Sequence, residues 1–169
     1  MDLRQTVMGI VIFLVFWAFQ NGYFNALGSA AWFVGIIIFS VLLFIIGKLV
    51  MPKPDPMINA VWMFSMAFAI VGTFIISFLG PSLGAVIPAG ATPAQLTPLV
   101  LSFWLVLFGA ALFVTGQEAK KPMTTLFGVI WLFSALHFVT AVGTGPNSYL
   151  HFGFITGLSY ILGGLLYKK

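Results

Sequence analysis

Ten charged residues in a chain of 169 constrain this protein more than any other feature of its sequence. Seven are Lys or Arg and three are Asp or Glu, which is 6% of the chain, whereas 61% of the residues are hydrophobic. A water-soluble domain carries about 25% charged residues to cover its surface. A soluble globule and a disordered chain are therefore excluded, as is aqueous nucleic-acid binding, because a few dispersed cations form no basic patch. The sequence predicts an all-α integral membrane protein that contacts the lipid bilayer.

The apolar residues fall into six segments, and a helix needs about 20 such residues to cross a bilayer. Proline and glycine separate the segments, as in the stretch 51–56 and in the long uncharged loop 80–95. We expect one domain, 1–169, of six transmembrane helices. Their expected ranges are 6–26, 29–50, 58–79, 96–115, 123–142 and 150–167.

All the charged residues lie on one face of this six-crossing topology. The cations are Arg4, Lys48, Lys53, Lys120, Lys121, Lys168 and Lys169. The connections on the opposite face carry no charge. Because Lys and Arg are enriched in cytoplasmic connections, we predict a multi-pass protein of the cell membrane with both termini in the cytoplasm.

No Asp, Glu, Lys or Arg lies in the interior of a predicted span; Lys48 is two residues from the end of the range 29–50. Ion-coupled transporters and proton pumps carry such residues in the membrane, so charge-coupled transport is disfavoured, and so is a catalytic carboxylate pair. The chain has no cysteine, which removes disulfides, thiolate metal ligands and thiol nucleophiles. We expect no enzymatic activity, no cofactor and no bound metal.

Two histidines, His137 and His151, are the titratable groups predicted at membrane depth. Both are expected in the outer half of the bilayer. Histidine titrates near neutral pH, so they are candidates for a pH sensor or a proton-linked contact with a solute, and a paired-histidine metal or haem site is conceivable. The ordinary alternative is that each imidazole bonds a neighbouring helix or lies at the headgroup boundary.

A polar interruption, Gln20-Asn21-Gly22-Tyr23, breaks the first apolar segment. Irregular backbone at membrane depth is tolerated only where protein or water surrounds it. Asn21 and Tyr23 are therefore candidates for a pore entrance, with an ordinary outer loop as the alternative.

Two further patterns bear on helix packing. Gly153 and Gly157 share one helix face, and small residues at this spacing let helix backbones approach closely, with a partner that the sequence does not identify. Trp104 and Trp131 lie in the middle of predicted spans, where they either pack against helices and lipid or line and gate a pore.

Several short motifs resemble the acetate/succinate uptake transporter family. They are Met8-Gly9, Asn21-Gly22-Tyr23-Phe24, Ile46-Gly47 and Leu150-His151-Phe152-Gly153 with Gly157. The family's opening Asn-Pro-Ala-Pro-Leu-Gly and its aromatic-Gly-x-Phe-Trp signature have no counterpart here. The resemblance implies a six-helix fold, a hexamer with one pathway in each protomer, and a constriction near Ile10, Ser65 and Phe133.

Two functions fit these features. The first is a channel or transporter that passes a small solute, such as acetate or ammonia, through an uncharged pathway as a homo-oligomer. The second is a non-catalytic accessory subunit of a multi-subunit membrane enzyme, such as a respiratory complex or a membrane monooxygenase, with other membrane subunits as partners.

Overall fold

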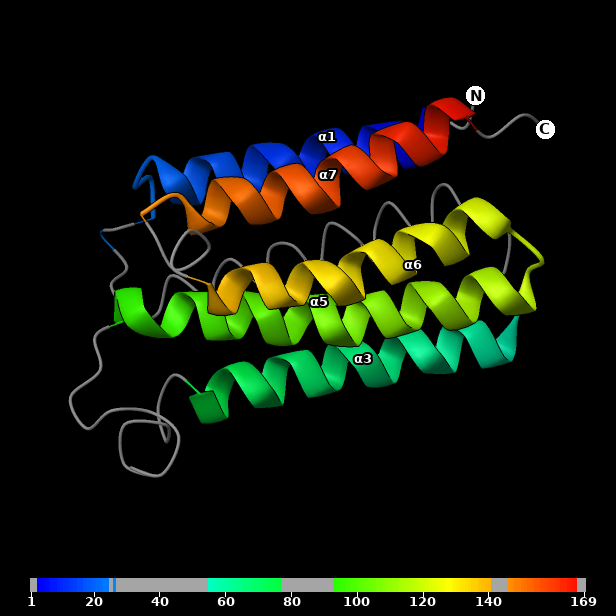
Figure 1. Ribbon diagram of the computed structural model, residues 1–169, viewed down its shortest axis with the longest axis horizontal. Coiled ribbons are helices and arrows are strands. Elements are labelled where there is room, and N and C mark those ends of the chain that lie inside the picture. Colours follow the sequence, from blue (N-terminus) through cyan, green and yellow to red (C-terminus); the bar gives the residue numbers. More distant parts are fainter. Residues whose placement is uncertain (1–2, 25, 27–54, 77–92, 141–145, 167–169) are drawn as a thin grey trace. The chain divides into compact units, whose positions relative to one another are not determined.

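The computed structural model describes residues 3–24, 26, 55–76, 93–140 and 146–166 (Figure 1). Within these residues the chain is helical and contains no strand. The elements are α1 (Leu3–Gln20), α3 (Pro56–Phe74), α5 (Pro93–Glu118), α6 (Pro122–Ser134), the 3-10 helix η3 (Ala135–Val139) and α7 (Ser148–Leu166). The predicted helix 29–50 and most of the predicted loop 80–95 lie outside the described residues.

Four of these helical segments are long and apolar enough to cross a membrane. They are Pro56–Phe74, Leu96–Glu118, Pro122–Val139 and Ser148–Leu166. The apolar stretch of α1, Gln5–Gln20, is shorter. In the part of the chain that the structure describes, the prediction of an all-helical protein is therefore confirmed, and four of its helical segments have the length and composition needed to span a membrane.

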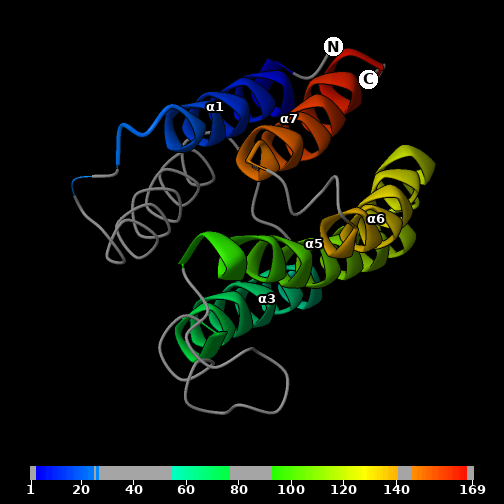
Figure 2. The same cartoon turned by 60° about the vertical axis from the view of Figure 1, so that its left-hand side comes forward.

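The chain divides into two compact units. The first contains α1 and α7, and the second runs from Pro56 to Ser148 and contains α3, α5, α6 and η3. Each unit is a set of antiparallel helices, seen for α1 and α7 in both Figure 1 and Figure 2.

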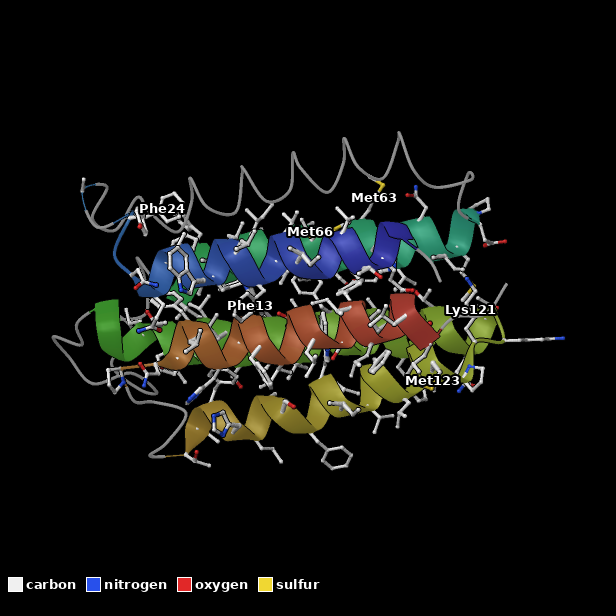
Figure 3. The ribbon with its side chains drawn as sticks, turned by 90° about the horizontal axis from the view of Figure 1, so that it is seen from above. Phe13, Phe24, Met63, Met66, Lys121 and Met123 are labelled. Atoms are coloured by element: carbon white, nitrogen blue, oxygen red, sulfur yellow. The ribbon has the colours of Figure 1, made fainter. Side chains whose placement is uncertain are left out.

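In the first unit, two glycines bring α1 and α7 together. A Cβ atom on Gly157 would lie 2.8 Å from the carbonyl oxygen of Gly9 and 3.1 Å from Cβ of Phe13. A Cβ on Gly9 would lie 2.5 Å from the Gly157 carbonyl oxygen. Phe13, labelled in Figure 3, belongs to this contact. The small-residue face predicted for the last helix therefore packs against the first helix of the same chain.

In the second unit, α5 is the central helix and lies between α3 and α6 (Figure 1). Its Val100, Leu101 and Leu105 are at most 1% exposed. A helix that is apolar all round is expected to be covered by others. By contrast, α3 buries a single seam of Ser65, Ala69 and Thr73.

Proline begins three helices of this unit, Pro56 in α3, Pro93 in α5 and Pro122 in α6. The first helical position suits proline, since its missing N–H needs no intrahelical acceptor there. This explains one difference from the predicted ranges: α5 starts at Pro93 instead of residue 96 and takes Pro98 into its first turns. Residues 93–95, which were predicted to end the loop 80–95, therefore belong to α5.

The first helix ends earlier than the predicted range 6–26, because α1 stops at Gln20 and a turn follows over 21–24. The predicted helix 123–142 is also shorter as an α-helix: α6 ends at Ser134 and continues as η3 to Val139. Both differences occur at the ends of predicted spans.

Candidate functional site

Gly22 stops α1 at the polar interruption. Its φ is 76°, a left-handed conformation that costs glycine little. The Tyr23 N–H donates to the Ala18 carbonyl at 3.2 Å, and the Gly22 N–H donates to the Phe19 carbonyl at 3.1 Å. This pair of bonds is a Schellman motif, which satisfies carbonyls at the end of a helix. The predicted break in the first apolar segment is thus a defined helix terminus.

The first residues of α7 meet the end of α1. The Leu150 N–H donates to the side-chain oxygen Oε1 of Gln20 at 3.3 Å. The rings of Phe19 and Tyr149 stack with their centroids 5.5 Å apart. The N–H groups of a helix's first turn have no acceptor within the helix, so Gln20 caps α7 from another helix.

This contact collects polar residues at one end of the first unit. Asn21 is exposed, and its side-chain Nδ2 donates to the Trp17 carbonyl at 2.8 Å. Tyr23 is 69% exposed, with its ring centroid 5.8 Å from that of Trp17. His151 follows Leu150 directly and is half-buried. Three of the predicted pathway residues, Asn21, Tyr23 and His151, therefore lie at the same end of the α1–α7 pair.

Gln20 completes this polar end, which contains amide, phenol and imidazole groups. The sequence placed Gln20 in the polar interruption but did not single it out as a site residue. The available signal was a glutamine that closes an apolar run of helix.

The three residues expected at a constriction do not belong to the polar end of the α1–α7 pair. Ile10 lies on α1 and is 45% exposed, beside the buried Gly9 that faces α7. Ser65 is 9% exposed on the buried seam of α3. Phe133 on α6 is 70% exposed. In the second unit, Ser65 thus belongs to a helix contact, whereas Phe133 points out of the unit, and the structure does not bring these two together.

His137 lies in the 3-10 helix η3, where its ring packs edge-on against Phe138 at a centroid distance of 5.3 Å. The carbonyl of His137 accepts both the N–H of Thr140 at 3.1 Å and its hydroxyl at 2.6 Å. The hydroxyl of Ser102 on α5 donates to the neighbouring Ala135 carbonyl at 2.9 Å. This histidine is half-buried and belongs to the second unit, unlike His151.

Buried and half-buried polar groups in the second unit bond one another between α3 and α5. The indole N–H of Trp104 donates to the Thr73 hydroxyl at 2.8 Å, and that hydroxyl donates to the Ala69 carbonyl at 2.6 Å. The indole N–H of Trp62 donates to the Thr115 hydroxyl at 3.0 Å. Trp104 is 4% exposed, so it packs within the unit as the first of its two alternatives predicts.

Trp131 on α6 is also 4% exposed and is likewise covered within the structure.

In the first unit, the hydroxyls of Thr156 and Ser159 on α7 donate hydrogen bonds to carbonyls one turn earlier in the same helix, at 2.7 Å each. Such bonds satisfy a hydroxyl within its own helix.

Among the residues that the structure describes, no three His, Cys, Asp or Glu side chains lie close enough together to hold a metal ion. The absence of a cofactor and of enzymatic activity stays a prediction. No protein-family model, no curated protein and no solved structure matches the chain.

Proposed function

We propose that the chain crosses the cell membrane six times with both termini in the cytoplasm, and that it passes a small uncharged solute or weak acid. The topology is supported by the helices long enough to span and by the turn between α5 and α6. That turn carries Lys120 and Lys121, both exposed, and Figure 3 labels Lys121 at the start of α6. The cytoplasmic side attracts such cations.

The polar end of the α1–α7 pair is the observation that carries the proposal of a pathway. Gln20 at the end of α1, Asn21 and Tyr23 in the turn that follows it, and His151 in the first turn of α7 gather there. Their amide, phenol and imidazole groups offer hydrogen bonds that replace part of the hydration shell of a solute. In the six-crossing topology this end lies at the outer face, where a solute would enter.

The chemistry of this end defines the solute class. A pathway without a fixed charge has no opposite charge to offset the large desolvation cost of a permanent ion, and this favours a neutral solute. Ammonia and the protonated form of acetate carry no charge and have both donor and acceptor groups. We propose these two molecules as the solutes to test, with the family resemblance favouring acetate.

The second candidate function is an accessory subunit of a membrane enzyme complex, and the packing of the second unit favours it. Its buried polar groups bond one another, while α3 presents a broad apolar face. On that face Met63 is 65%, Phe64 66% and Phe68 59% exposed. Neighbouring subunits would cover such a face as readily as lipid does.

Two experiments separate the functions. The mass of the assembly extracted in mild detergent should be a multiple of this chain alone for a conduit, with six copies implied by the family resemblance. Co-migration with unrelated subunits supports the accessory function instead. Flux of acetate and of ammonia into liposomes with the purified chain tests the conduit itself, and flux no faster than in empty liposomes for both solutes contradicts it.

A further inference from the structure

Across the junction of α6 and η3, the exposure of the side chains follows a three-residue period. Phe133, Leu136 and Val139 are 70%, 63% and 61% exposed, whereas Ala135 and Phe138 are 4% and 0% exposed. A 3-10 helix has three residues in each turn and an α-helix 3.6. The exposure therefore follows the backbone of η3 and fixes which residues face out of the unit.

The 3-10 winding of η3 points the His137 side chain in a different direction from the one it would have in a continuous α-helix. Had α6 continued as an α-helix, each residue would add ~100°, and His137 would lie roughly 40° from the direction of Phe133. With the ~120° steps of a 3-10 helix beyond Ser134, it lies roughly 100° from Phe133. The same change moves Val139 from the covered side to the exposed side. His137 is half-buried because the backbone winds more tightly here.

One side chain from another helix contacts the backbone where the winding changes. Ala135 is the first residue of η3, and its carbonyl accepts the hydroxyl of Ser102 at 2.9 Å. A carbonyl oxygen at membrane depth needs a hydrogen-bond donor within the protein, since hydrocarbon offers none. Ser102 is half-buried on α5 and follows Leu101, which is fully buried.

We propose that Ser102 is a positioning residue for His137. Its hydrogen bond to the Ala135 carbonyl holds 135–139 in the 3-10 conformation and thereby turns the imidazole away from the exposed face. Without the hydroxyl, the segment winds as a continuation of α6. His137 then moves toward the exposed face and Val139 toward the covered one.

A nitroxide scan tests this directly, because the chain contains no cysteine of its own. Single cysteines at positions 133 to 139 are spin-labelled in the full chain in liposomes, and collision with oxygen, which concentrates in lipid, is measured. With Ser102 present, we expect maxima at positions 133, 136 and 139. In the Ser102→Ala and Ser102→Val backgrounds, we expect the last maximum to move from 139 to 137.

Two controls sharpen the test. Ser102→Thr keeps the hydroxyl and has nearly the shape of the valine variant, so it should keep the three-residue period. Ser134→Ala removes a hydroxyl at the junction itself and should also keep it. An unchanged period in both the alanine and valine backgrounds overturns the proposal. So does failure of both to fold while the threonine variant folds, because the hydroxyl would then hold the helices together instead of directing one side chain.

A role for His137 in a pathway rests on the proposed function. The positioning of the His137 side chain by Ser102 does not. Flux measured in the same variants keeps the two apart. A moved maximum with unchanged flux supports the positioning by Ser102 and removes His137 from the pathway. An unmoved maximum overturns the positioning and leaves the conduit to its own test.

Discussion

Trp104 and Thr73 join α5 to α3 by a hydrogen bond of 2.8 Å between the indole N–H and the threonine hydroxyl. The Trp62–Thr115 bond joins the same two helices with the roles exchanged, so that each helix gives one tryptophan and one threonine. The spacing from tryptophan to threonine is the same in both helices. Two bonds at separate levels therefore fix the register of an antiparallel pair that otherwise packs through apolar side chains.

Replacing Thr73 by valine removes the acceptor of the Trp104 bond while keeping the shape of the side chain. We expect the free energy of unfolding to fall by about 1 kcal/mol, because bonds between membrane helices average ~0.6 and reach ~1.7 kcal/mol in double-mutant cycles. Unfolding of the parent, Thr73→Val, Trp104→Phe and the double variant in detergent gives the coupling. Thr73→Ser keeps the hydroxyl and is the control. Additive effects of the two substitutions would contradict a direct bond.

Gly157 is one of the glycines at which α7 approaches α1 closely. Gly157→Leu should separate the two helices, because even a Cβ atom would lie 2.8 Å from the Gly9 carbonyl oxygen. The measurement is the melting temperature of the purified chain in detergent. Phe154→Leu places the same residue on the same helix at a position that is 57% exposed, and it should leave the melting temperature near that of the parent. Equal melting temperatures for both variants would refute the close contact.

Lys120 occupies the position in the α5–α6 turn that Gly22 occupies after α1. Its φ is 52°, and the Lys121 N–H donates to the Gly116 carbonyl at 2.8 Å while the Lys120 N–H donates to the Gln117 carbonyl at 3.2 Å. The left-handed conformation costs an L-residue ~1–2 kcal/mol, so Lys120→Gly should raise the unfolding free energy by about 1 kcal/mol.

Lys121→Gly is the matched control for this change, since it removes the same charge from a residue with a φ of −110°. It should lower the stability or leave it unchanged, because glycine only adds freedom to the unfolded chain at this position. Chemical unfolding in detergent measures both variants. A gain in stability from Lys121→Gly equal to that from Lys120→Gly would remove the backbone explanation.

The two ends of the α6–η3 segment should lie on opposite sides of the membrane. Single cysteines replace Gln117, before α6, and Asn147, before α7; both residues are exposed. In intact cells, a membrane-impermeant maleimide should label the cysteine at 147 and reach the one at 117 only after permeabilisation. Labelling of both positions from one side would contradict the crossing, and the reverse pattern would invert the topology.

Features of this fold that depend on the backbone of a single residue, such as a helix end or a close contact at a glycine, can be predicted from the sequence. The polar break at Gly22 and the close-packing face of Gly153 and Gly157 could be identified from the sequence, because glycine allows a left-handed turn and a close approach wherever it occurs. The partner of that face could not. Gly9 completes the contact from the other end of the chain, and no local pattern marks one glycine as the neighbour of another.

The 3-10 helix η3 shows a second limit. The residues of 135–139 are as compatible with an α-helix as those of α6, and the α-helical prediction extended through them to residue 142. A bond from Ser102, far away in sequence, meets the backbone where the winding changes. Gln20 was overlooked for a similar reason, since its cap on Leu150 exists only once α1 and α7 are side by side.

The flux of solute through the purified chain tests the central proposal most directly. Liposomes with the parent chain should take up acetate or ammonia faster than empty liposomes. Gln20→Leu removes the amide at the polar end and should slow that uptake roughly three- to tenfold, the effect of losing one hydrogen bond. Gln117→Leu, the same substitution at an exposed position after Thr115, should have no effect. Uptake equal to that of empty liposomes, or identical uptake by parent and Gln20→Leu, would contradict a pathway through this end of the protein.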